Sequence, residues 1–222
     1  MKKTALVIGA SGLVGTALVE QLTADPAFGN VKAFVRRKIP AEHAKLEQII
    51  IDFNAPEKHS EMISGDVVFC AMGTTIKTAG SKEAFAKVDY TYVYNFAHIA
   101  KQNGIPRFVL VSSIGVTEHG NGSNFYLTVK RDVENALRKL KFPSLIIVRP
   151  SMLLGDRKEF RLGERIAKVL MKGLGFLFLG KLKKYKAIEA SVVARAMILL
   201  SKTDLEEVSV FESDRLQKLG AG

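Results

Sequence analysis

A tyrosine and a lysine stand four residues apart at Tyr126 and Lys130, in a segment with helical periodicity. Four residues make about one helical turn, so the phenol and the ammonium should share one face. A phenol exchanges protons poorly at neutral pH, and a neighbouring cation stabilises its deprotonated form. The spacing alone decides little, because five tyrosines and 22 lysines in 222 residues give roughly 0.5 such pairs by chance.

Two adjacent serines offer a hydroxyl to the same chemistry. Ser112 and Ser113 follow the apolar run Phe108–Val111 directly, and Ser113 precedes Tyr126 by 13 residues. Parallel sheets bind ligands at the carboxyl ends of their strands, where a serine can hold a substrate carbonyl while the phenol donates its proton. We predict that Ser113 is this hydroxyl and that Ser112 satisfies backbone groups, although the sequence leaves the choice between them open.

Three glycines follow the first apolar run of the chain, at Gly9, Gly12 and Gly15. Gly9 permits a tight turn, Gly12 lets backbone amides approach a pyrophosphate, and Gly15 permits close packing of helix and strand. The amino end of the following helix favours anions, and Ser11 adds a hydroxyl donor. The alternative is an ordinary turn and cap, but the position between a strand and a helix favours dinucleotide binding.

The end of the next strand indicates which dinucleotide binds. Sites specific for NAD carry Asp or Glu about 20 residues past the glycines, to bind the ribose hydroxyls. Here the run Val31–Val35 ends in Arg36 and Arg37 instead. Guanidinium groups bind phosphate through paired hydrogen bonds, so the sequence predicts NADP(H), with an ordinary basic surface turn as the alternative.

These side chains need a scaffold of alternating strands and helices. Short apolar runs rich in β-branched residues alternate with longer segments of helical spacing, which predicts an α/β fold: a doubly wound, Rossmann-like parallel sheet with helices on both faces. The expected strands contain Leu6–Ile8, Val31–Val35, Gln48–Ile51, Val67–Cys70, Phe108–Val111 and Leu145–Val148. Tyr90, Tyr92, Tyr94 and Phe96 also alternate as in a strand, but the helical spacing persists from about Lys82 to Lys101 and favours a helix.

We predict one NAD(P)-binding Rossmann-like domain over residues 1–222, with a small C-terminal substrate cap or lid at 151–186. The alternation of strand and helix weakens beyond Pro150. We expect a basic helix at Phe160–Lys172, an apolar loop with a basic rim at Gly173–Lys186, and a helix at Ser191–Leu200.

Taken together, these motifs resemble those of the short-chain dehydrogenase/reductases, and among them the atypical members similar to the HIV Tat-interacting protein. The resemblance covers nearly the whole chain. It is carried by GASGLVG (9–15), VRRK (35–38), DF (52–53), CAMGTT (70–75), VD (88–89), VSSIG (111–115), NFYLTVK (124–130) and VRPSMLLGDR (148–157).

The resemblance implies the roles of individual residues. Ser113, Tyr126 and Lys130 would form a catalytic triad in which Lys130 also binds the nicotinamide ribose. Relatives with an extended C-terminal domain carry Val-Asn where this chain has Val88-Asp89, so a proton relay through that asparagine amide is not carried over. The implied cofactor-binding residues are Gly9, Ser11, Gly12, Leu13, Val14, Gly15, Arg36, Arg37, Asp52, Phe53, Cys70, Ala71, Met72, Gly73, Tyr126, Lys130, Pro150, Ser151, Met152 and Leu153.

The formal net charge of +11 is concentrated in one segment, because residues 157–186 hold ten basic and two acidic residues. That excess favours an anionic substrate or a protein partner docked there, or serves solubility alone. The chain lacks nucleic-acid-binding signatures, and neither its single cysteine, Cys70, nor its four histidines show metal-ligand spacing. With no membrane-length apolar run and no secretory signal, we expect a cytoplasmic protein.

These features favour an NADPH-dependent oxidoreductase that transfers a hydride between nicotinamide and a small-molecule carbonyl, alcohol or quinone-like substrate. The alternative is an NADP(H)-binding regulatory module that docks a protein and has little or no turnover, since this scaffold serves both roles.

Overall fold

The computed structural model describes residues 2–117, 120, 124–155, 185–205 and 207–221. Seven parallel strands form the central sheet in the order β3-β2-β1-β4-β5-β6-β9. The strands are β1 (Lys3–Ile8), β2 (Phe28–Val35), β3 (Leu46–Ile50), β4 (Val67–Cys70), β5 (Arg107–Val111), β6 (Ser144–Arg149) and β9 (Val208–Glu212). The strand order reverses between β1 and β4, and α/β sheets bind ligands in the crevice beyond such a reversal.

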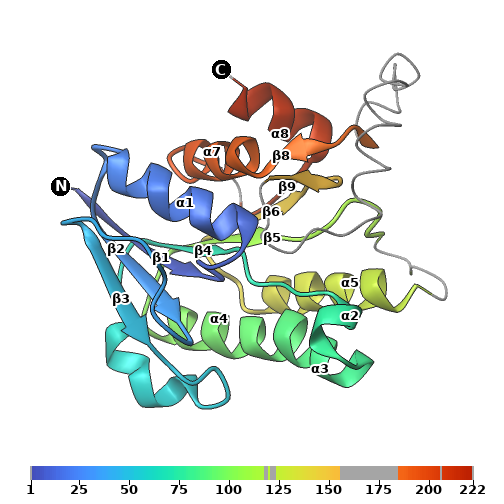
Figure 1. Cartoon of the computed structure of the whole chain (residues 1–222), viewed down its shortest axis with the longest axis horizontal. Helices are drawn as coiled ribbons and strands as arrows, with labels where there is room; N and C mark the ends of the chain where they lie inside the picture. The colour runs from blue at the N-terminus through green and yellow to red at the C-terminus, as the bar shows by residue number, and fades with distance from the viewer. Residues whose placement is uncertain (1, 118–119, 121–123, 156–184, 206, 222) are drawn as a thin grey trace.

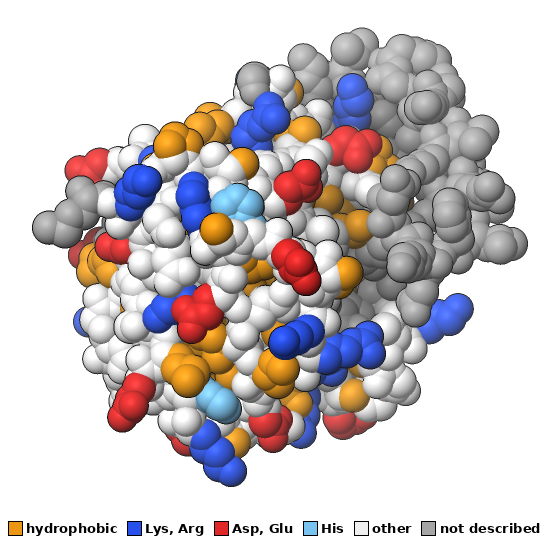
Figure 2. Space-filling view, turned by 60° about the vertical axis from the view of Figure 1, so that its left-hand side comes forward, with side chains coloured by type: hydrophobic (Ala, Val, Ile, Leu, Met, Phe, Trp, Pro, Cys, Tyr) orange, Lys and Arg blue, Asp and Glu red, His pale blue; other side chains and the backbone are white. Residues whose placement is uncertain are grey.

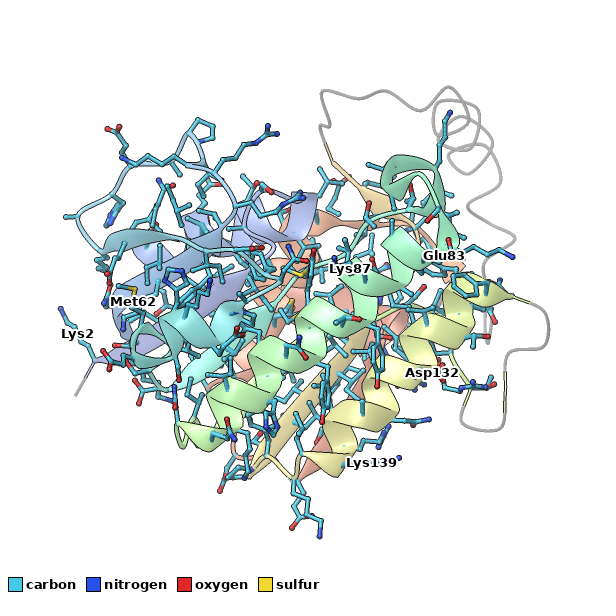
Figure 3. The ribbon with its side chains drawn as sticks, turned by 90° about the horizontal axis from the view of Figure 1, so that it is seen from below. Lys2, Met62, Glu83, Lys87, Asp132 and Lys139 are labelled. Carbon is cyan, nitrogen blue, oxygen red and sulfur yellow. The ribbon has the colours of Figure 1, made fainter. Side chains whose placement is uncertain are left out.

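Helices cover both faces of this sheet (Figure 1). One face carries α1 (Leu13–Ala24), α7 (Ala190–Leu200) and α8 (Ser213–Gly220), and the other carries α4 (Tyr92–Gln102) and α5 (Phe125–Lys139). Figure 3 shows α4 and α5 side by side below the sheet, with Asp132 and Lys139 on α5. The shorter elements are the 3₁₀ helix η1 (Pro56–Met62), α2 (Ile76–Ala79), α3 (Lys82–Ala86) and the π helix η2 (Lys87–Thr91).

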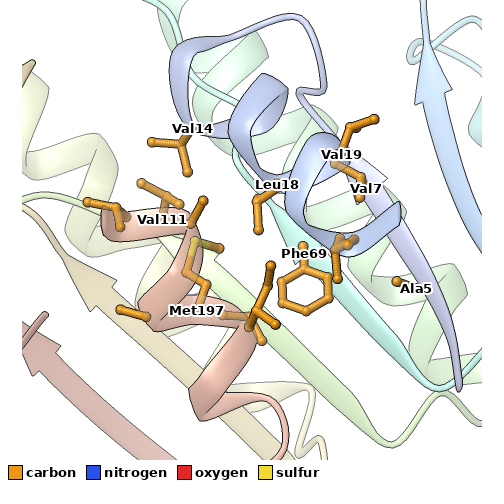
Figure 4. Close-up of a cluster of buried hydrophobic side chains, with 14 of the residues drawn as sticks. Ala5, Val7, Val14, Leu18, Val19, Phe69, Val111 and Met197 are labelled. Carbon is orange, nitrogen blue, oxygen red and sulfur yellow. The ribbon is translucent and has the colours of Figure 1, made fainter. Parts of the chain in front are cut away.

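The central strands are continuous apolar runs because both of their faces are buried. Val7 of β1 and Phe69 of β4 pack beneath α1 and α7, where they meet Leu18 and Met197 (Figure 4). Leu6 belongs to the second apolar cluster, on the face covered by α4 and α5. The sheet is thus held between two apolar layers, and its carboxyl edge is left to carry polar residues.

The six predicted strands and the doubly wound arrangement are confirmed. The segment from about Lys82 to Lys101 is helical, as predicted, and runs from α3 through η2 into α4. The alternating aromatic residues fit this helix: Tyr90 and Tyr94, one turn apart, stack with ring centroids 6.1 Å apart, while Phe96 is buried in the core.

We predicted that the alternation of strands and helices weakens beyond Pro150. This prediction was wrong for the end of the chain, because β9 adds a seventh strand and α8 follows it. The predicted helix at Ser191–Leu200 is confirmed as α7. The predicted basic helix at Phe160–Lys172 and nearly all of the loop at Gly173–Lys186 lie outside the described residues. The chain enters and leaves that segment through a short parallel pair, β7 (Leu153–Leu154) and β8 (Ile188–Glu189).

Basic and acidic side chains are interspersed over the described part of the face seen in Figure 2. Along the sequence, the main concentration of one sign is segment 157–186, with ten basic and two acidic residues. Among the residues that the structure describes, no helix is long and apolar enough to cross a membrane.

Candidate active site

The glycine turn between β1 and α1 packs against the end of β4. Gly9 has φ +81°, and a Cβ there would lie 2.5 Å from the Ala71 backbone. A Cβ on Gly15 would lie 2.0 Å from the carbonyl oxygen of Gly9. Both contacts involve backbone that cannot swing away, so the turn requires glycine at these two positions.

Gly12 is different, because a Cβ there would meet only ordinary contacts, 3.4 Å from the Gly9 oxygen. Packing therefore does not explain this glycine, whereas the approach of a pyrophosphate does. Gly12 is also the N-cap of α1, which has no side-chain cap, so the first amides of the helix keep their hydrogen-bonding capacity for an anion. These residues fit a dinucleotide phosphate. Ser11 is exposed beside them, whereas Val14 is buried in the core under α1.

The ends of β2 and β3 present polar residues to solvent. Arg36 and Arg37 are exposed directly after β2. Asp52 is exposed after β3, and hydrogen bonds from the backbone and side-chain amides of Asn54, at 2.9 and 2.6 Å, hold its pKa below the usual value. Phe53 is buried against Tyr92, so its ring faces the core.

The end of β4 lies between the glycine turn and α5. Cys70 is fully buried, and burial raises the pKa of its thiol to about 12, so it is a small core residue rather than a nucleophile. Met72 is buried as well, while Gly73 is exposed. A Cβ on Gly73 would lie 3.6 Å from the Lys130 ammonium nitrogen, which places this loop against the lysine.

Tyr126 and Lys130 lie on the first turns of α5. Asn124 caps the helix, because its side chain accepts a hydrogen bond from the Leu127 amide at 3.2 Å. Tyr126 is half-buried and packs against Phe85, with ring centroids 5.5 Å apart. Lys130 is buried, and its ammonium nitrogen lies 6.0 Å from the centre of the Tyr126 ring. The predicted spacing thus places phenol and ammonium on one face.

Lys130 forms an ion pair with Asp89 of η2, with 2.8 Å between Nζ and Oδ1. Burial disfavours the charge on Lys130, but attraction to Asp89 and Tyr126, together with the hydrogen bond to Asp89, outweighs it and raises the lysine pKa above its usual 10.5. Lys130 is therefore an ammonium ion at neutral pH.

The two serines after β5 differ in their surroundings. Ser112 is buried and donates to Oε1 of Glu134 at 2.5 Å; it binds a side chain rather than the backbone groups that we expected. Arg149 donates two hydrogen bonds to the same carboxylate, from Nε at 3.0 Å and from Nη2 at 2.5 Å.

Ser113 is half-buried, and its loop packs on α5, since a Cβ on Gly115 would lie 3.4 Å from Leu127.

The segment after β6 supplies the last predicted residues. Pro150 and Ser151 are buried. The Ser151 hydroxyl donates to the Lys186 carbonyl and accepts a hydrogen bond from the Ser213 hydroxyl at 2.9 Å. Met152 is exposed, and Leu153 packs against the cluster that includes Leu13.

The structure thus gathers the predicted residues at the carboxyl edge of the sheet, although four of their side chains belong to the core: Val14, Phe53, Cys70 and Met72. Sequence reasoning missed the ion pair of Asp89 and the buried Glu134–Arg149 pair. Glu134 follows Tyr126 and Lys130 at the same four-residue spacing on α5, and this charged stripe on a core-facing side was a readable signal.

Comparison with known proteins identifies the family. The NAD(P)H-binding family profile matches residues 9–170. The chain belongs to this NAD(P)H-binding family. It is 36% identical over 170 residues to protein HTATIP2 of Rattus norvegicus, covering 75% of this chain and 69% of the relative. It is 33% identical over 224 residues to FMP52 of Candida albicans, covering 96% of each. The resemblance stated from the motifs is confirmed.

Solved structures show the same fold at low identity. WbmH of Bordetella bronchiseptica, in complex with NAD⁺, has a TM-score of 0.73 at 16% identity and covers 99% of this chain and 79% of its own. MoeE5 with UDP-glucose and NAD has a TM-score of 0.70 at 18% identity and covers 98% of this chain and 81% of its own. These likenesses extend the Rossmann-like assignment of the family to nearly the whole chain.

The names of the relatives correct one prediction. Several FMP52 proteins that match more than nine tenths of this chain are named mitochondrial. The expectation of a cytoplasmic protein was therefore wrong. It had rested on the absence of a signal and of a long apolar run, and neither absence identifies a compartment.

Proposed function

We propose that this protein is an NADPH-dependent oxidoreductase that transfers a hydride between nicotinamide and a carbonyl, alcohol or quinone-like substrate. The observation that supports it most is the pairing of Tyr126 with a buried, charged Lys130 at the carboxyl edge of the sheet. Burying a charged lysine beside a phenol is costly, and titratable groups in such perturbing surroundings cluster at functional sites.

The residues have distinct roles in this proposal. Bound NADPH supplies the hydride. Tyr126 donates a proton to the carbonyl oxygen, and Lys130 stabilises the phenolate that remains. Ser113 donates a hydrogen bond that orients the carbonyl, because it is half-buried and, among the described residues, its hydroxyl donates only to the Ile114 carbonyl at 3.3 Å. The Ser112 hydroxyl is buried and donates to Glu134 at 2.5 Å. A positioned acid of this kind contributes about 10²-fold or more to the rate.

The choice of NADP(H) rests on Arg36 and Arg37, which are exposed directly after β2 where an NAD site would carry a carboxylate. NAD is the coenzyme named in the complexes of WbmH and MoeE5, so it is the competitor to be tested. For the substrate we propose an anionic carbonyl compound, since the basic segment 157–186 follows β7 and precedes β8 in the chain, and these two strands pair with each other.

The test is NADPH oxidation in the presence of aldehydes, ketones and quinones. We expect turnover by the wild type and a loss of at least about 10²-fold in Tyr126→Phe, with nearly unchanged NADPH affinity. Tyr94→Phe, on the stacked side of α4, is the matched control and should retain full activity. Equal activity of Tyr126→Phe would contradict the proposal. Tight NADPH binding without turnover would favour the regulatory module, docked through segment 157–186.

A further inference from the structure

A buried carboxylate connects the lysine of the Tyr126–Lys130 pair to the loop after β4. Asp89 is only 1% exposed. Its Oδ1 lies 2.8 Å from the Lys130 ammonium, and its Oδ2 accepts a hydrogen bond from the Thr74 amide at 2.9 Å. One side chain thus holds α5 and the loop that follows β4 in a fixed relation.

The local geometry of the helix brings Asp89 inward. Residues Lys87–Thr91 form the π helix η2 between α3 and α4. A π turn adds a residue to the helical repeat, and such turns inside α-helices are frequent at functional sites. Asp89 is buried, while its neighbours Val88 and Tyr90 are half-buried, so the turn directs the carboxylate to the interior.

Among the described residues, no other carboxylate near Lys130 is available to balance its charge. Tyr126 lies on the same helix, and Cys70 approaches from β4. The Cys70 thiol stays neutral, because burial raises its pKa to about 12. Glu134, one turn further along α5, is bound by Arg149 and Ser112. Asp89 is therefore the group that compensates the buried ammonium.

We propose that Asp89 is a positioning residue for the reaction assigned above: it fixes the Lys130 ammonium beside the Tyr126 ring and keeps it charged. The inference rests on the proposed function for its kinetic consequence and on the ion pair for its geometry. A buried lysine without a counter-ion loses its proton readily, because a low-dielectric environment disfavours the charged form. A neutral Lys130 would no longer stabilise the phenolate of Tyr126.

The kinetic test compares Asp89→Asn with the wild type. We expect kcat to fall at least about tenfold, and the pH of half-maximal alcohol oxidation to rise by about one unit or more. Asp132→Asn is the control, since Asp132 lies on α5 near Lys130 but is half-exposed, and among the described residues it pairs with its neighbour Arg131, at 2.9 Å. A purely structural role would lower the unfolding temperature without moving the pH profile. An unmoved profile, or one moved to lower pH, would overturn the inference.

A second measurement is independent of turnover. Lysine labelled at Cε allows Lys130 to be titrated by NMR, with Lys130→Met identifying its signal. We expect the wild-type lysine to remain charged at about pH 10 and the Asp89→Asn lysine to lose its proton at lower pH. Identical titration in both proteins would overturn the inference, even if the wild type turns over substrate. Lack of turnover with a displaced titration would instead contradict the proposed function alone. Should Asp89→Asn fail to fold, a wild-type Lys130 that deprotonates below about pH 10 would overturn the inference.

Discussion

At the residue scale, the glycines of the turn between β1 and α1 meet two different requirements: close packing of the backbone and room for a phosphate. A Cβ on Gly15 would overlap the carbonyl oxygen of Gly9, whereas a Cβ on Gly12 would meet only ordinary contacts. The fold therefore needs glycine at position 15. It does not need glycine at position 12, the N-cap of α1, where a phosphate would bind.

Two alanine variants should therefore fail in different ways. We expect Gly15→Ala to lose about 3 kcal/mol of unfolding free energy, because backbone must shift to admit the methyl group. Gly12→Ala should lose about 1 kcal/mol or less, since alanine is only a poorer N-cap, yet bind NADPH at least about tenfold more weakly. Urea denaturation and titration of NADPH fluorescence measure the two effects. Unchanged NADPH affinity in Gly12→Ala would contradict the phosphate site.

At the element scale, the strands and helices could be predicted from patterns that recur along the sequence, whereas features that depend on a single turn could not. The inner strands were predictable because both of their faces are buried, so each is an unbroken apolar run. β9 was not predicted, because all five of its residues are half-buried at the sheet edge and form no buried apolar run. The glycine turn and the Tyr126–Lys130 spacing follow local rules. The approach of Asp89 does not, because it depends on a π turn that shifts the helical register.

A salt bridge between elements gives a pH-dependent prediction. Asp25, at the carboxyl end of α1, pairs with Lys202 beyond α7 and accepts the Ala27 amide at 2.9 Å. Burial opposes the charge, but these partners outweigh it and hold the pKa of Asp25 below 3.8. A depressed carboxylate pKa gives stability that is present above the unfolded-state value and lost as pH falls through the folded-state value.

We therefore expect Asp25→Asn to lower the unfolding free energy by about 0.5–1 kcal/mol at pH 7, a modest loss because the pair is partly exposed. The difference from the wild type should shrink below about pH 4 and disappear once Asp25 is protonated. Urea denaturation across this pH range measures it. Asp132→Asn, which breaks only a pair within α5, should show a smaller loss. A difference that stays constant with pH would contradict the role assigned to the Asp25 charge.

At the scale of the whole molecule, the strand order reverses between β1 and β4, and this reversal marks the crevice where a coenzyme would lie. The two halves of the sheet carry different functional residues. The half built from β1, β2 and α1 carries the glycine turn, Arg36 and Arg37, which suit the phosphates of the adenosine end. The half built from β4, β5 and α5 carries Ser113, Tyr126 and Lys130, to which we assign the proton transfer. Binding should therefore stabilise the fold independently of catalysis.

Because a ligand that binds only the folded chain stabilises it by mass action, NADPH at 100 times its Kd should add about 2.7 kcal/mol. For a domain of this length, that corresponds to a rise in Tm of about 5–10 °C. NADH at the same concentration should raise Tm less, because it lacks the 2′-phosphate that the guanidinium groups of Arg36 and Arg37 would bind. The double variant Arg36→Ala/Arg37→Ala should respond equally to both coenzymes, and Tyr126→Phe should respond like the wild type. Equal shifts with the wild type would contradict the choice of NADP(H), and no shift with either coenzyme would contradict the dinucleotide site itself.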